Sequence, residues 1–172
     1  MKKTTRFTVY AAAIGAMYLV LTHLQNLIFP DSATMAIQFR LSEALCVLAL
    51  FTPAAIPGLT VGCLLFNLTY AGTLPLDFLL GSAATLGASW VMWRTRNLTV
   101  RGYPLLAMVQ PALWNALLIG WELTHYIGMG FSFNAVCVAL GELGVLLIPG
   151  SVLYYAIRSR GLDKRLFEKQ SL

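Results

Sequence analysis

Apolar segments follow one another along almost the whole chain, and this arrangement restricts the possible fold more than any other feature. Of the 172 residues, 58% are hydrophobic and 11% are charged, whereas an average soluble domain has about 25% charged residues. A soluble domain of this size could not bury so much apolar surface, and the exposed remainder would drive aggregation. Lipid solvates such surfaces directly, so the sequence predicts an all-α integral membrane protein.

Proline, glycine and charged residues divide the chain into six apolar segments. We expect a single transmembrane domain over residues 1–172 with six transmembrane helices, at about 7–28, 41–55, 58–70, 76–93, 104–123 and 131–157. Pro53 and Pro57 break what would otherwise be one helix of about 45 Å, longer than a bilayer core of ~30 Å requires. The second and third segments are shorter than the ~20 residues of an ordinary span, so they either pack against neighbours or span incompletely. The first segment is too long for the apolar part of a signal peptide.

Lysine and arginine gather in three places: the N-terminus, residues 94–101 and residues 158–169. The connectors on the opposite side carry one cation, Arg40. The positive-inside rule therefore places the N- and C-termini and the 94–101 loop in the cytoplasm. The same distribution does not resemble a phosphate-binding stripe, so we expect no nucleic acid partner.

Polar residues inside the apolar segments carry the functional signal, because burying them in lipid is costly. Counting 1.5 Å per residue from the outer end of each segment places every acid in the outer half or at the midplane. This asymmetry predicts a polar cavity open to the outside. The candidate substrate-binding residues are Arg40, Glu43, Asn67, Asp77, Trp114, Asn115, Glu122, Asn134 and Glu142. Four carboxylates against one arginine favour a ligand that is rich in N–H donors or carries a cation.

Each candidate also has an ordinary interpretation. Arg40 and Glu43 are three residues apart and fit a local ion pair, and Asp77 after Pro75 fits a helix cap. Glu122 fits a solvated interface residue. The asparagines fit hydrogen bonds between helices, and Trp114 fits the interfacial aromatic belt. Glu142 is the hardest to explain in this way, because a carboxylate near the midplane needs a partner or water.

The first segment contains two overlapping pairs of small residues four apart, Ala11/Gly15 and Ala12/Ala16. Such pairs let another helix approach closely. We expect Ala12 and Ala16 to form an interface with a partner protein, and packing within the bundle is the alternative.

The chain lacks the motifs of common catalytic sites: Gly-x-Ser-x-Gly, His-Glu-x-x-His, Cys-x-x-Cys and the phosphate-binding loop. Its three cysteines have no paired spacing, which argues against a metal. We therefore expect no enzyme activity, no ATP hydrolysis by this chain, no cofactor and no metal.

Several motifs together resemble the QueT family among the S components of energy-coupling factor (ECF) transporters. They are the block Gln38-Phe39-Arg40-Leu41-Ser42-Glu43, the Pro/Gly/Asn pattern from Phe51 to Asn67, Asp77 followed by Gly81, and the small residues of the first segment. The resemblance implies a substrate-binding subunit in the bacterial cell membrane that captures a queuosine precursor, a 7-deazaguanine base. It also implies partners: a transmembrane coupling protein and two cytoplasmic ATPases that drive uptake.

Three alternatives stay open: an S component for another vitamin, a self-sufficient secondary carrier, and a structural membrane subunit. The absence of inverted repeats and of any inner-half polar path argues against the carrier.

Overall fold

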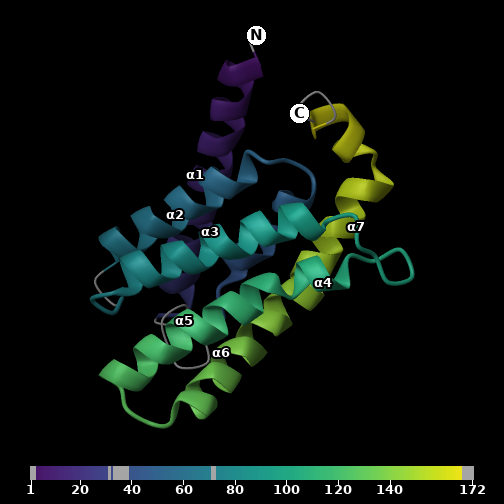
Figure 1. The fold of residues 1–172 in the computed structure, drawn as a ribbon. Coiled ribbons are helices and arrows are strands. Elements are labelled where there is room, and N and C mark those ends of the chain that lie inside the picture. Colours follow the sequence, from purple (N-terminus) through teal and green to yellow (C-terminus); the bar gives the residue numbers. More distant parts are fainter. Residues whose placement is uncertain (1–2, 31, 33–38, 71–72, 168–172) are drawn as a thin grey trace.

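A computed structural model describes residues 3–30, 32, 39–70 and 73–167, and within these ranges the chain is helical (Figure 1). Its elements are α1 (Lys3–Ile28), η1 (Leu41–Leu50), α2 (Ala55–Thr69), α3 (Asp77–Thr95), α4 (Leu105–Met108), α5 (Gln110–Tyr126), α6 (Phe131–Val145), η2 (Leu146–Gly150), α7 (Ser151–Ser159) and η3 (Asp163–Phe167). Two stretches of the described chain, Lys3–Ile28 and Phe131–Ser159, are long and apolar enough to cross a membrane. The all-α class is thus confirmed and fits a membrane protein, while the count of six spans stays a prediction.

The helices depart from the expected segments at three places, each of which contains a proline. The second segment is a 3-10 helix that ends at Leu50 rather than at residue 55, and ten residues of 3-10 helix rise about 20 Å. The fifth is interrupted at Val109, because Pro111 cannot donate a hydrogen bond to the carbonyl one turn earlier. The sixth contains the π turn η2, whose wider loop accommodates Pro149.

Helices α1 and α2 pack at backbone contact through glycines. A Cβ atom added at Gly58 would lie 2.6 Å from the carbonyl oxygen of Ala11, and one at Gly62 would lie 2.8 Å from that of Gly15. The Ala11/Gly15 pair therefore packs inside the bundle, as small residues four apart allow. Ala12 and Ala16 are exposed on a different side of α1.

We expect Gly62→Ala to lower the thermal unfolding temperature of the purified protein. The new methyl group would lie 2.9 Å from Tyr18 Cβ and 3.1 Å from Gly15 Cα, and overpacking of this kind costs about 1–3 kcal/mol. The matched control is Gly144→Ala in α6, where the nearest atom to the added Cβ is 3.9 Å away. Equal unfolding temperatures for the two variants would show that α1 and α2 are not in backbone contact.

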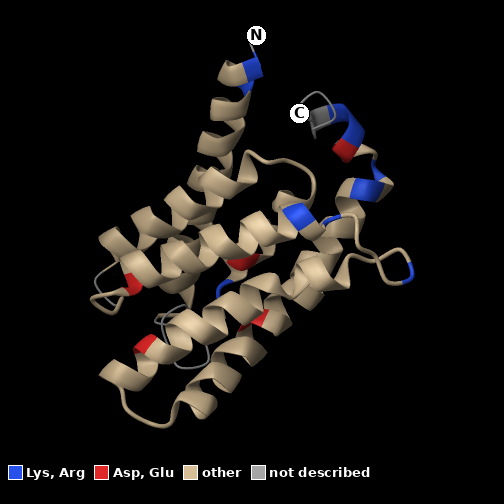
Figure 2. Ribbon diagram, in the orientation of Figure 1, with Lys and Arg blue, Asp and Glu red and all other residues tan. Residues whose placement is uncertain are grey.

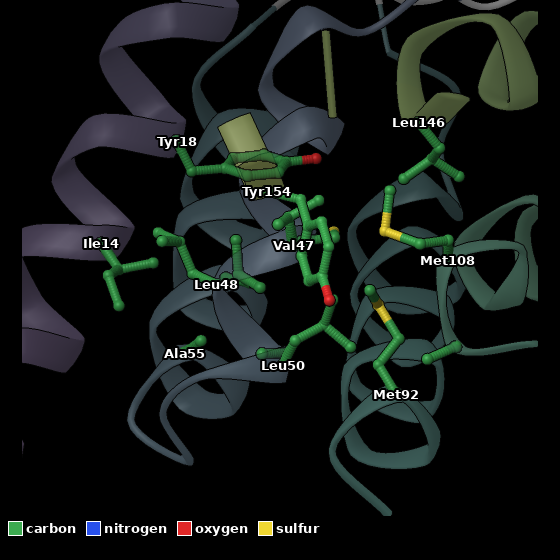
Figure 3. Packing of buried hydrophobic residues seen from close by; sticks show 14 of the residues in the cluster. Ile14, Tyr18, Val47, Leu48, Leu50, Ala55, Met92, Met108, Leu146 and Tyr154 are labelled. Carbon is green, nitrogen blue, oxygen red and sulfur yellow. The ribbon is translucent and has the colours of Figure 1, made fainter. Parts of the chain in front are cut away.

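Apolar side chains fill the part of the bundle between the first half of α1, η1, the end of α3 and α7. Figure 3 shows Ile14, Tyr18, Val47, Met92 and Tyr154 converging there. These side chains are at most 4% exposed. The buried polar residues come mainly from the second half of α1, the start of η1, α3 and the helices α2, α5 and α6.

Both ends of the described chain lie at the same end of the bundle (Figure 1). Lysine and arginine gather at that end and in the loop between α3 and α4, whereas most acidic residues lie within the bundle (Figure 2). This arrangement agrees with the prediction that the termini and the 94–101 loop share one face of the membrane. Their cytoplasmic orientation stays a prediction.

Candidate functional site

Arg40 is an arginine buried between three elements of the bundle. It precedes η1, and its side chain is 3% exposed. One guanidinium nitrogen lies 3.6 Å from Asp77 Oδ2 at the start of α3, and the other contacts Cys63 Sγ on α2 at 4.0 Å. The guanidinium carbon is 5.7 Å from the centre of the Phe66 ring, within cation–π range. Arg40 therefore links η1, α2 and α3.

Asn67 extends this link towards α3. Its Nδ2 donates a hydrogen bond to the backbone oxygen of Asp77 at 2.8 Å. Gly81, one turn further along α3, makes room for it, because a Cβ atom there would lie 2.8 Å from Asn67 Nδ2. A glycine four residues after Asp77 thus leaves the space that the side chain of Asn67 occupies. Asp77 pairs with Arg40 across two elements, and α3 begins without a side-chain cap.

Glu43 lies on the first turn of η1 and is 1% exposed. Tyr18 Oη on α1 donates a hydrogen bond to Glu43 Oε1, and Cys46 Sγ donates to Oε2 at 3.0 Å. Next to this pair, Thr22 Oγ1 donates to Ser42 Oγ at 2.7 Å. Both oxygens of Glu43 are therefore held by the protein itself.

Glu142 and Asn115 form the part of the site between α5 and α6. Asn115 Nδ2 donates to Glu142 Oε1 at 2.9 Å, and both side chains are buried. Glu142 lies within electrostatic range of Glu43 and Arg40. The α5–α6 pair is thereby joined to the group around η1.

Glu122 on α5 is 0% exposed, which rules out a solvated interface position. It lies within electrostatic range of Asp77 and Arg40. The structure therefore brings Arg40 and all four predicted carboxylates into one region, which we call the buried charge cluster: Arg40, Glu43, Asp77, Glu122 and Glu142.

Two further candidates have contacts elsewhere. The ring of Trp114 packs on Gly87 of α3, where an added Cβ atom would lie 2.7 Å from the ring. Asn134 Nδ2 donates to Thr124 Oγ1 and to the carbonyl of Gly128, both at 3.0 Å. Asn134 thus forms hydrogen bonds with the end of α5 and with the loop that joins α5 to α6. Trp114 packs between α3 and α5.

Sequence reasoning missed Tyr18 and Cys46, which hold Glu43. A signal for Tyr18 was present, because Tyr18, Thr22 and Gln25 recur at helical spacing and form a polar stripe on an otherwise apolar helix. All three are buried. Cys46 carried no comparable signal.

The buried charge cluster has more acceptors than donors. Arg40 is the one buried cation in the described ranges, against four buried carboxylates. Within the same ranges, five buried side-chain oxygens next to these charges have no hydrogen-bond partner: Asn67 Oδ1, Asp77 Oδ1, Glu122 Oε1, Glu122 Oε2 and Glu142 Oε2. Leaving such atoms unpaired is costly. The cluster is therefore suited to a ligand that brings N–H donors.

A helical bundle with long apolar helices and a buried excess of acceptors has the features of a membrane protein that binds a small polar molecule. The family model described as QueT transporter matches residues 8–159. The chain belongs to the QueT transporter family, and the resemblance read from its motifs is confirmed. No curated protein matches the chain, and no solved structure does.

Proposed function

We propose that this chain is the substrate-binding subunit of an ECF-type importer and captures a 7-deazaguanine base, a queuosine precursor, from outside the cell. In this proposal it crosses the bacterial plasma membrane six times, with both termini in the cytoplasm. Membership in the QueT transporter family supports a transport role. The finer assignment of the substrate depends on the chemistry of the buried charge cluster.

The observation that carries the substrate assignment is the set of five unpartnered oxygens in that cluster. A 7-deazaguanine offers N–H donors from its ring and its exocyclic amine, and an aminomethyl substituent adds a cation. Ionised carboxylates accept hydrogen bonds only, so they suit both features. The guanidinium of Arg40 is the matching donor for the carbonyl oxygen of the ring.

In this proposal uptake is driven by ATP, and partners supply the ATP hydrolysis because the sequence contains no phosphate-binding loop. We assign energy supply to an ECF transmembrane coupling protein with two cytoplasmic ATPases. The exposed pair Ala12 and Ala16 on α1 is the face that we assign to the coupling protein. Small residues on that face let a partner helix come close.

We expect the purified protein to bind a 7-deazaguanine base more tightly than riboflavin, thiamine or biotin, because those ligands offer fewer N–H donors to the acidic cluster. Isothermal titration calorimetry in detergent measures this, and mass spectrometry of small molecules released from the purified protein identifies the ligand without prior choice. Saturable binding of another vitamin, with no heat from any deazaguanine, would assign the chain to a different substrate.

A further inference from the structure

Three side chains at the meeting point of α2, α3 and α5 form a part of the buried charge cluster with its own chemistry. Glu122 is 0% exposed, Asp77 2% and Asn67 5%. Asn67 and Asp77 both lie against Gly81, with Asn67 Nδ2 at 2.8 Å and Asp77 Oδ1 at 3.7 Å from the position of an added Cβ. Glu122 lies within electrostatic range of Asp77. We call these three residues the α3–α5 acceptor group.

Glu122 is the member of the group with the least compensation. Both of its carboxylate oxygens are buried, and neither makes a hydrogen bond of normal geometry in the described part of the chain, although the backbone of Leu76 and the side chain of Asp77 lie close to it. The other carboxylates of the cluster are at least partly compensated: Asp77 pairs with Arg40, Glu43 accepts from Tyr18 and Cys46, and Glu142 accepts from Asn115. Glu122 interacts with Arg40, with Asp77 and with the backbone of Leu76, but it forms no ion pair in the described part of the chain. A buried carboxylate without an adjacent cation is costly, so its position points to a group supplied from outside the protein.

The α3–α5 acceptor group has the composition that a primary ammonium requires. An ammonium carries three N–H donors and no acceptor. The group offers one unpartnered oxygen on each of Asn67 and Asp77 and two on Glu122. A planar amide edge has fewer donors, lies in one plane and carries no charge to balance Glu122.

We propose that Asn67, Asp77 and Glu122 form a subsite for an alkylammonium group of the ligand, and that Glu122 determines selectivity for cationic over neutral substrates. This inference rests on the proposed function, because it divides the binding site of a 7-deazaguanine into two parts. The ammonium on the ring substituent is held by the α3–α5 acceptor group. The N–H edge of the ring is held by Glu142 at the α5–α6 side of the cluster.

The test compares two ligands that share one ring: 7-aminomethyl-7-deazaguanine, which carries the ammonium, and 7-methyl-7-deazaguanine, which lacks it. Calorimetric titration of the wild-type protein is expected to show at least about tenfold tighter binding of the aminomethyl compound, as loss of a charge-assisted hydrogen bond predicts. Glu122→Gln is expected to remove most of that preference while changing the affinity for the methyl compound by less than about threefold. Glu168→Gln, an identical substitution in the C-terminal segment, is the matched control.

Three results would overturn the inference. Equal binding of both compounds by the wild-type protein shows that the site does not select an ammonium, and this measurement needs no variant. Equal weakening of both compounds by Glu122→Gln, in a variant that unfolds at the wild-type temperature, assigns Glu122 to the ring or to the fold. Binding of neither compound removes the proposed function as well, whereas the first two results leave that function standing.

Discussion

Cells that produce the double variant Ala12→Trp/Ala16→Trp are expected to lose uptake of the ligand, while the purified variant binds the ligand with wild-type affinity. Both alanines are exposed on α1, and four residues of helix separate them by about 6 Å. Two indole rings on this face would hold a partner helix away from α1. They would not disturb the contact between α1 and α2, because that contact runs through Gly15 on another side of the helix.

The design needs a control for the mere presence of tryptophan on a lipid-facing helix. Val136 and Leu140 on α6 are also four residues apart and are 56% and 62% exposed. Val136→Trp, Leu140→Trp is therefore expected to keep uptake. Co-purification of the coupling protein supplies a second readout, which should fail only for the α1 variant. Normal uptake and normal co-purification by the α1 variant would show that this face contacts lipid and not a partner.

A variant with tryptophan on α1 that also loses ligand binding would indicate a disturbed bundle. Ala12→Leu, Ala16→Leu then repeats the test with side chains that resemble the rest of the exposed surface. If this milder variant binds ligand and still transports normally, the docking assignment is wrong. Loss of uptake with intact binding would support it.

The two overlapping small-residue pairs show where sequence reasoning ends for this chain. Ala11/Gly15 and Ala12/Ala16 have the same spacing and differ by one position, which is a rotation of about 100° around the helix. Only the position of α2 decides which pair is internal, and α2 contributes its own Gly58 and Gly62 to that contact. The pattern predicted a close approach of helices but not which pair makes it.

The gathering of the acids in one region was predictable from the sequence, whereas their individual partners were not. The regular rise of a helix predicts a depth for each residue, and the counted positions of Glu43, Asp77, Glu122 and Glu142 in their segments predicted one shared region. Which side chain meets which depends on the rotation and tilt of each helix. The pair of Asn115 with Glu142 and the bond from Tyr18 to Glu43 are of this second kind.

Local backbone geometry limited the prediction in a different way. Proline indicated where helices break, but not whether the chain would form a separate short helix, a 3-10 helix or a π turn. The rise per residue is about 1.5 Å in an α-helix and about 2.0 Å in the 3-10 helix η1. A depth counted at about 1.5 Å per residue is therefore too small along η1, and the error grows with each residue. Trp114 and Asn134 were predicted to line the site, whereas the structure places them in contact with Gly87, Thr124 and Gly128.

Glu142→Gln is expected to weaken ligand binding by about tenfold to a hundredfold, because loss of a charge-assisted hydrogen bond costs roughly 1.5–3 kcal/mol. In the wild-type protein Asn115 Nδ2 lies 2.9 Å from Glu142 Oε1. The amide of the variant keeps the shape of the side chain, and its oxygen can still accept this hydrogen bond. What changes is the second position: Glu142 Oε2 has no partner in the described ranges, and an NH2 group there can no longer accept a ligand N–H. Calorimetric titration measures the change.

Glu43→Gln tests whether a carboxylate of the cluster contributes to ligand binding when both of its oxygens already accept hydrogen bonds from the protein. It should also weaken binding, through the lost charge, but by less than Glu142→Gln, because both Glu43 oxygens accept bonds from Tyr18 and Cys46. An amide at residue 43 would turn one of these contacts from donor–acceptor to donor–donor, so part of its effect should appear as a lower unfolding temperature.

Glu168→Gln, outside the described residues, is expected to bind as the wild type does. Wild-type affinity in both Glu43→Gln and Glu142→Gln would make these carboxylates structural and would move the ligand site elsewhere. A larger loss at Glu43 than at Glu142, without a change in stability, would mean that the ligand contacts η1 rather than the α5–α6 side of the cluster.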